Sequence, residues 1–161
     1  MGIEIERKFL VINDDWRAAA HAVIPMAQGY INDMGALDRG DQKASVRVRI
    51  EGEDAALNLK SRTLGRSRQE FEYPIPVADA HDLLALCVGG RIEKRRHLVH
   101  HGGLLWEVDE FLGVNAGLVV AEVELDDAEQ AILLPPWAGA EVTDDVRYYN
   151  VALAAKPYSS W

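Results

Sequence analysis

The sequence predicts an α+β fold made mainly of antiparallel β-strands, closed into a barrel, with helices packed outside. Short apolar segments recur along the chain, and several of them carry a charge at every second position. The links between segments are short and turn-like, as at residues 51–54 and 64–66, so neighbouring strands can pair as hairpins. Such a sheet can close on itself, which removes its free edges.

About eight strands are expected because each segment combines strand-forming residues with flanking turn signals. In the first of them, Ile3, Ile5 and Phe9 supply an apolar face and the alternate positions are charged. The expected strands cover residues 2–11, 27–33, 44–51, 55–62, 67–75, 91–99, 103–111 and 117–125.

Four helices are expected between or after the strands. Each follows a capping residue or an early acid, and each ends near glycine or proline, which do not continue a helix. They are placed at Asp14 to Val23, at Asp79 to the Gly89-Gly90 pair, at Asp126 to Leu133 before Pro135, and at Thr143 to Lys156 before Pro157.

The bulk properties indicate one domain over residues 1–161, because 17.9 kDa is enough to bury a core without disulfides. The net charge of -9 argues against a nucleic-acid partner, since phosphates would be repelled at long range. The single cysteine, Cys87, excludes an internal disulfide and fits a reducing compartment. No membrane-spanning stretch is evident, so the cytoplasm is the expected location and no membrane partner is expected.

Charged and polar side chains two residues apart recur in the predicted strands, mostly as pairs of like charge, and each set lies on one face. A single pair is usually a solvent-exposed strand face, which is the simpler explanation for any one of them. Repetition favours a confined interior where opposite charges or bound ions balance them. The sets are Glu4, Glu6 and Lys8; Arg47 and Arg49; Asn58 and Lys60; Arg68, Glu70 and Glu72; Lys94 and Arg96; Glu107 and Asp109; and Glu122 and Glu124.

The two signs of charge suit different parts of a metal–polyphosphate complex. Carboxylates are hard oxygen donors for Mg²⁺ or Mn²⁺, and the metal in turn bridges phosphate oxygens. The arginines offer planar donor forks for phosphate oxygens, while the lysines act as compact point charges. A barrel interior lined with both signs could therefore hold a linear triphosphate.

The ordered motifs carry a resemblance to a known family. The chain contains Glu-x-Glu-x-Lys near its start, followed by Arg-x-Arg, Lys-x-Arg and Glu-x-Glu in later strands. It resembles the CYTH superfamily, the triphosphate tunnel metalloenzymes, over residues 2–155, and the short bacterial inorganic triphosphatases look most similar. The first motif alone is weak, whereas the ordered set is specific.

The resemblance implies an eight-stranded antiparallel barrel whose tunnel binds triphosphate and Mg²⁺ or Mn²⁺, and it implies hydrolysis of a phosphoanhydride bond. It assigns three groups of residues. Metal ligands are Glu4, Glu6, Glu122 and Glu124; phosphate ligands are Lys8, Arg47, Arg49, Lys60, Lys94 and Arg96; and Glu70 and Asp109 bind a second metal or position water.

The resemblance also implies that Tyr30 and Lys8 take part in catalysis, because Gln28-Gly29-Tyr30 is similar to the family's second-strand segment. A strand aromatic whose hydroxyl is satisfied locally is an equally good reading of Tyr30. Near the C-terminus, positions 146 and 149 lack the basic residues often found in the family, so substrate preference is expected to differ. Arg147 is a further candidate phosphate ligand, with an exposed helix cation as the alternative.

Other functions stay open at this point. A class IV-type adenylate cyclase, a thiamine or nucleoside triphosphatase, or a non-catalytic polyphosphate-binding module would use similar charged residues. The expected partner in each case is a triphosphate or polyphosphate, and a homodimer is not excluded.

Overall fold

The computed structural model describes residues 5–61 and 69–161, so Glu4 and Arg68 lie outside the described part. Each of the eight predicted segments overlaps a strand, although β2 begins seven residues before its predicted start, and one further strand was not predicted. The strands are β1 (Ile5–Val11), β2 (Ala20–Tyr30), β3 (Ala44–Glu51), β4 (Asp54–Ser61), β5 (Glu70–Ile75), β6 (Val88–His101), β7 (Leu104–Phe111), β8 (Val119–Leu125) and β9 (Ala138–Glu141).

The predicted eight-stranded closed barrel is wrong for the described residues. The strands form a nine-stranded sheet in the order β5-β4-β3-β2-β6-β7-β8-β1-β9, with β5 and β9 at its edges. The described pairings are antiparallel, as predicted. The additional strand β9 pairs with β1 at Phe9 and Val11, on the side of β1 not taken by β8. Because both sides of β1 are paired, β1 has no free edge to accept β5.

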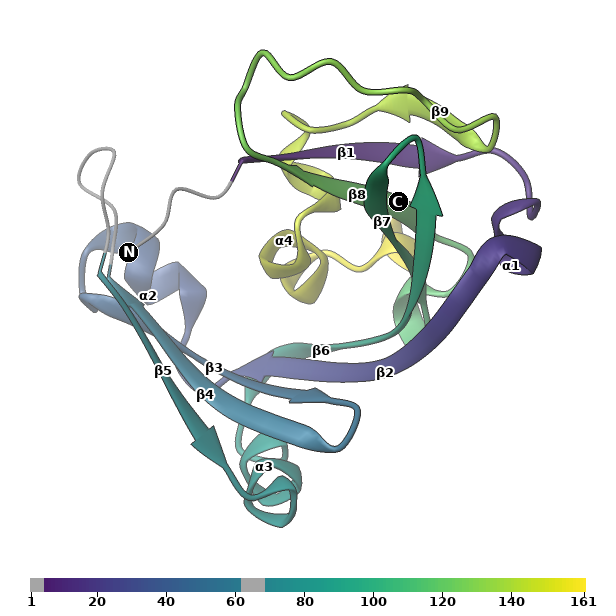
Figure 1. Cartoon of the computed structure of the whole chain (residues 1–161). Coiled ribbons are helices and arrows are strands. Elements are labelled where there is room, and N and C mark those ends of the chain that lie inside the picture. Colours follow the sequence, from purple (N-terminus) through teal and green to yellow (C-terminus); the bar gives the residue numbers. More distant parts are fainter. Residues whose placement is uncertain (1–4, 62–68) are drawn as a thin grey trace. The chain divides into compact units, whose positions relative to one another are not determined.

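The helices are shorter than predicted (Figure 1). They are α1 (Trp16–Ala19), α2 (Met34–Arg39), α3 (Val77–Leu84) and α4 (Asn150–Ala155), with 3-10 turns η1 (Gly113–Asn115), η2 (Val146–Tyr148) and η3 (Tyr158–Ser160). Of these helices, α3 is confirmed near its predicted place and α2 was not predicted. Among the described residues, no helix is long and apolar enough to cross a bilayer.

Three helix predictions need correction. The segment from Asp14 to Val23 is helical only for one turn, because β2 begins at Ala20. The segment 126–133 contains no helix; Asp127 and Gln130 accept hydrogen bonds from nearby backbone N–H groups, which competes with helix formation. The final segment is broken into η2 and α4, and the Asp145 side chain caps η2 by accepting from the N–H of Arg147.

The described chain divides into two compact units. Unit 1 contains residues 5–24 and Lys94–Trp161, and unit 2 is Pro25–Glu93 without the undescribed residues 62–68. Strands β2 and β6 contribute residues to both. The prediction of a single domain over residues 1–161 stays a prediction.

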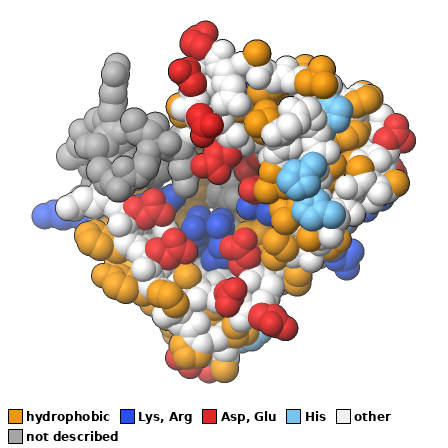
Figure 2. Space-filling view, viewed as in Figure 1, with side chains coloured by type: hydrophobic (Ala, Val, Ile, Leu, Met, Phe, Trp, Pro, Cys, Tyr) orange, Lys and Arg blue, Asp and Glu red, His pale blue; other side chains and the backbone are white. Residues whose placement is uncertain are grey.

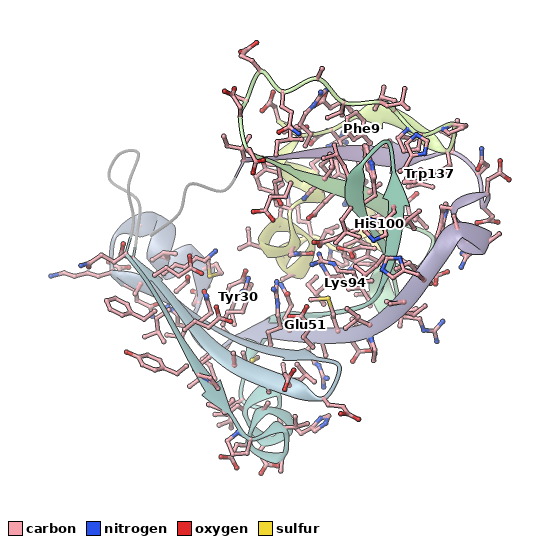
Figure 3. All side chains as sticks on the ribbon, viewed as in Figure 1. Phe9, Tyr30, Glu51, Lys94, His100 and Trp137 are labelled. Atoms are coloured by element: carbon pink, nitrogen blue, oxygen red, sulfur yellow. The ribbon has the colours of Figure 1, made fainter. Side chains whose placement is uncertain are left out.

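The core of unit 1 covers one face of β1, β8, β7 and β6. Strand alternation brings Phe9, Trp106 and Val123 to this face, and the loop before β9 adds Trp137. The Trp106 ring lies 5.7 Å from that of Phe9 and 5.6 Å from that of Trp137, and Trp106 has no exposed surface. Figure 3 labels Phe9 and Trp137. The charged residues at alternate positions therefore lie on the opposite face of the same strands.

The core of unit 2 is formed where α3 packs on β3 and β4. Val48 and Ile50 of β3 face Ala80 and Leu84 of the helix. Gly29 of β2 is close to Cys87, whose sulfur would lie 2.9 Å from an added Cβ. Cys87 is thus a packing residue, as its apolar sequence context indicated. The alternate positions of β3, Arg47 and Arg49, lie on the other face of the strand.

Truncation of the central indole should destabilise unit 1 strongly. We expect Trp106→Ala to lower the free energy of unfolding by about 3–5 kcal/mol, because it leaves a cavity between two other aromatic rings. The exposed Val114→Ala variant is the control and should change it by no more than about 0.5 kcal/mol. Urea denaturation followed by tryptophan fluorescence and circular dichroism measures both. Equal midpoints for the two variants would contradict the assigned core.

The pairing of β1 with β9 should be sensitive to acid. Arg7 donates two hydrogen bonds to Glu141, at 2.9 and 2.6 Å, and Thr143 donates a third at 2.6 Å. The Arg7 and Thr143 hydrogen bonds lower the pKa of Glu141 from 4.5 to about 2. The contribution of Glu141 to stability is therefore present above about pH 4.5 and is lost as pH falls towards 2. Glu141→Gln should be less stable than the wild type at pH 5, and the difference should shrink on acidification to pH 2.5; a constant difference would contradict this.

Candidate active site

The charged face of unit 1 is assembled by the register of β1, β8, β7 and β6. Glu6 is directly opposite Glu124, and Lys8 is opposite Glu122, which is in turn opposite Glu107. This face is the reverse of the one that covers the apolar core, as alternation along a strand requires. Asp109 is the next residue of β7 on this face after Glu107, and it is opposite Arg96 of β6.

A buried ion cluster lies at the centre of this face. Asp109 and Lys94 are each only 1% exposed, and the Lys94 Nζ lies 2.7 Å from Asp109 Oδ2. Arg96 binds the same carboxylate bidentately, at 2.8 and 2.9 Å. Burial alone would raise the pKa of Asp109, but the charges of Lys94 and Arg96 outweigh burial and hold the pKa below its ordinary value. Asp109 is therefore an anion that orients two cations.

Glu107 completes the cluster and was not singled out from the sequence as a site residue. Its Oε2 lies 2.5 Å from Arg96 Nη1. Burial raises the pKa of Glu107, although Arg96 opposes this, and the nearby carboxylates of Glu122 and Asp109 raise it further. The signal was present in the sequence, because Glu107 shares the face of Asp109, but only the register shows that it contacts Arg96.

Lys8 lies in the same face of unit 1 and is 6% exposed. Its Nζ is 3.3 Å from Glu122 Oε1 and 3.3 Å from the backbone oxygen of Tyr148. The third direction around the ammonium is covered by the Tyr149 ring, whose centroid lies 4.7 Å away. The Glu122 carboxylate also lies 3.9 Å from Arg96, so it links Lys8 to the buried cluster.

Unit 2 carries a second set of predicted residues on one face of β2, β3, β4 and β5. Gln28 Oε1 accepts two hydrogen bonds from Arg49, at 3.0 and 2.8 Å. The Arg47 Nε is buried and has no hydrogen-bond partner within the described residues. An arginine donor left unsatisfied in this way is suited to bind an anion. Tyr30, labelled in Figure 3, is opposite Arg47 in the β2–β3 register.

Lys60 of β4 is directly opposite Glu70 of β5, and both were predicted as site residues. Asn58 donates to Glu70 Oε1 at 2.8 Å, and Lys60 Nζ is 3.9 Å from the same oxygen. In this arrangement Glu70 balances a cation and fixes an amide. Within the described residues these contacts do not favour a second-metal role for Glu70, so that role stays a prediction.

Arg147 is not brought to either set. Its side chain is 62% exposed and is paired with Asp145 at 2.6 Å. The guanidinium also lies over the rings of Tyr148 and Trp161. The sequence alternative of an exposed cation describes this position better than a phosphate ligand does.

The carboxylates of unit 1 include the predicted ligands of a divalent metal ion. Among the described residues, no three His, Cys, Asp or Glu side chains form a group that could hold a metal ion. Glu6 and Glu124 nevertheless are both exposed and directly opposed, a like-charge arrangement that a divalent cation relieves. Their oxygen donors are of the kind that Mg²⁺ and Mn²⁺ prefer. The oxygen donors of Glu6 and Glu124 therefore fit such an ion. Glu4, the other predicted ligand near the start of the chain, lies outside the described residues.

The chain is similar to known proteins over nearly its whole length. The family model for the CYTH domain matches residues 2–158. The chain belongs to the CYTH family. The resemblance inferred from the ordered motifs is thereby confirmed.

Two curated CYTH-family relatives match almost the whole chain, and both are inorganic triphosphatases. That of Acetivibrio thermocellus is 44% identical and covers 100% of this chain and 99% of its own length. That of Nitrosomonas europaea is 42% identical, with coverages of 94% and 96%.

Solved structures support the CYTH fold. A crystal structure of an inorganic triphosphatase has a TM-score of 0.72 at 38% identity and covers 96% of this chain and 95% of its own. A Hippeastrum protein, described as a candidate adenylyl cyclase with dominant triphosphatase activity, has a TM-score of 0.57 at 18% identity, with coverages of 79% and 81%. Identity this low supports a shared fold alone.

Removing the buried anion should expose how much unit 1 depends on it. We expect Asp109→Asn to lower the free energy of unfolding by about 3–5 kcal/mol, because Lys94 is left buried without its counter-charge and Arg96 loses its bidentate partner. Glu110→Gln on the same strand is the control. Glu110 pairs with Arg17 near the surface, so its loss should cost no more than about 1 kcal/mol. Chemical denaturation at pH 7 compares the two; similar losses would contradict the central place of Asp109.

Proposed function

We propose that this chain hydrolyses a phosphoanhydride bond of inorganic triphosphate in a reaction that depends on a divalent metal ion. The observation that carries the proposal is the match, over nearly the whole chain, to two inorganic triphosphatases at 44% and 42% identity. The charged faces of the two units supply the chemistry that such a substrate needs. We further propose that residues 1–161 act as one domain and that the protein is cytoplasmic.

The cations bind phosphate oxygens and offset the negative charge that develops during the reaction. Lys94 and Arg96 are suited to this role because Asp109 holds both in place before substrate arrives. In unit 2, Arg47, Arg49 and Lys60 take the same role, and Arg47 has an unsatisfied Nε. Positioning and electrostatics supply most of the acceleration in phosphoryl transfer.

The bond changes are those of a simple hydrolysis. The oxygen of a water molecule bonds to the terminal phosphorus, and the bond from that phosphorus to the bridging oxygen breaks. Pyrophosphate leaves with the electron pair, and the water loses a proton. Tyr30 and Lys8 are the proposed catalytic residues. Tyr30, assisted by the Lys8 ammonium, orients the water or accepts its proton.

A divalent ion would be held by the opposed pair Glu6 and Glu124, with Glu4. The predicted metal role of Glu122 stays a prediction, because its carboxylate pairs with Lys8. When bound, it supplies positive charge that bridges phosphate oxygens. The other residues act without it: the arginines and lysines bind phosphate, and Asp109 and Glu107 keep Arg96 oriented. Whether Mg²⁺ or Mn²⁺ is preferred is decided by titrating each ion against activity.

The test is phosphate release from a panel of tripolyphosphate, ATP, thiamine triphosphate and longer polyphosphate, with Mg²⁺ and Mn²⁺ supplied separately. We expect tripolyphosphate to be the best substrate. Glu6→Gln should lose most of the metal-dependent turnover, whereas the exposed Glu129→Gln should retain it. Turnover by Glu6→Gln equal to that of the wild type would count against the assignment.

The catalytic role of Tyr30 is tested separately. A positioned proton acceptor contributes about 10²–10⁴ in rate, so Tyr30→Phe should lower kcat by a factor in that range while KM changes little. If Tyr30 were a packing aromatic with a locally satisfied hydroxyl, Tyr30→Phe would have kcat close to the wild type. Steady-state kinetics on tripolyphosphate separate these outcomes.

The other candidate functions give different products from the same experiment. A cyclase converts ATP to cyclic AMP and pyrophosphate, whereas a hydrolase releases orthophosphate. A non-catalytic module would bind tripolyphosphate tightly, measured by calorimetry, without phosphate release. Light scattering of the same sample decides between a monomer and a homodimer.

A further inference from the structure

The segment between β9 and α4, residues 142–149, contacts both the backbone and the side chain of Lys8. Within unit 1, the N–H of Lys8 donates to Thr143 Oγ1 at 3.0 Å, and the carbonyl of Lys8 accepts from the N–H of Val142 at 2.8 Å. The Lys8 ammonium donates to the carbonyl of Tyr148 at 3.3 Å. Lys8 is thus fixed at both ends by one short stretch of chain.

The aromatic ring of Tyr149 covers the ammonium from another side, 4.7 Å from its centroid. Tyr149 is itself held, because its hydroxyl donates to the carbonyl of Thr143 at 2.7 Å. Thr143 in turn donates to Glu141, which is bound by Arg7. The ring is therefore anchored to the β1–β9 pairing and not only to its own turn.

We propose that Tyr149 is a positioning residue that acts through Lys8, by holding its ammonium in a fixed direction on the charged face of unit 1. This inference rests on the proposed function, in which Lys8 takes part in catalysis. A free lysine side chain has many rotamers, and fixing them at the moment of binding costs conformational entropy. A ring that orients the ammonium beforehand removes part of that cost.

The chemistry of the contact suits a cation that must bind phosphate. A ring face attracts an ammonium but carries no net charge, so the contact is weaker than a charge-assisted hydrogen bond to a phosphate oxygen. A second carboxylate at this place would bind the ammonium more strongly and would repel the substrate. The aromatic ring orients Lys8 without either effect.

The experiment compares Tyr149→Leu, which removes the ring face, with Tyr149→Phe, which keeps it and loses only the hydroxyl. Lys8 is first probed without substrate, by brief acetic anhydride labelling and peptide mass spectrometry. Lys43 and Lys156, both exposed, serve as internal standards. We expect Lys8 to be labelled several-fold faster in Tyr149→Leu and at close to the wild-type rate in Tyr149→Phe.

Kinetics on tripolyphosphate provide the second readout. We expect kcat of Tyr149→Leu to fall by about threefold to thirtyfold, the range that one cation–π contact supports, and Tyr149→Phe to recover most of the loss. Tyr149 is 37% exposed, so the thermal midpoint should change little in either variant.

Each outcome decides between the two proposals. Equal Lys8 labelling in Tyr149→Leu and the wild type would overturn the positioning role, whatever the kinetics. A fall in kcat of Tyr149→Leu without faster labelling of Lys8 would also overturn it, because the ring would then not act through Lys8. If the wild type fails to release phosphate but Lys8 labelling responds to Tyr149→Leu, the proposed function is wrong and the positioning of Lys8 stands.

Discussion

The buried carboxylate of Asp109 is the constraint on which the charged face of unit 1 depends. Two cations, Lys94 and Arg96, converge on it in a buried place where an uncompensated charge would be costly. Asp109 thereby holds two positive charges at one place in a protein whose net charge is -9. Figure 2 shows carboxylates scattered over the displayed surface, in keeping with that excess.

The two faces of one set of strands divide the work of unit 1. The core face packs Trp106 between Phe9 and Trp137, which gives β1, β7 and β8 a rigid base. The reverse face carries Glu122, which joins Lys8 to Arg96. Because successive side chains alternate across a strand, a residue that packs the core fixes the position of the charged residue next to it. Stability and function are thus coupled through the register.

The position of each charge does not by itself reveal its role. Asp109 and Glu70 were expected near metal or water, yet both carboxylates bind cations or amides of their own unit. Glu6 and Glu124 differ, because the register sets one directly against the other. In a family whose substrate is a polyanion, carboxylates that hold the arginines and lysines in place are as necessary as those that bind a metal ion.

The sequence determined the strand pattern, the charged faces and the family, because side-chain alternation and the ordered motifs are local properties that survive without coordinates. It also placed α3 near its position, from the prolines before it, but the helix ends at Leu84 and the predicted stop at Gly89-Gly90 lies within β6. The tertiary structure decided what depends on long-range pairing. β9 takes the free side of β1 and leaves the sheet open, β2 shortens the predicted first helix to α1, and Glu107 and Tyr149 become partners of Arg96 and Lys8. The physical reason is that a sequence period fixes the face on which a side chain lies, whereas only strand register and chain folding fix which distant residue it meets.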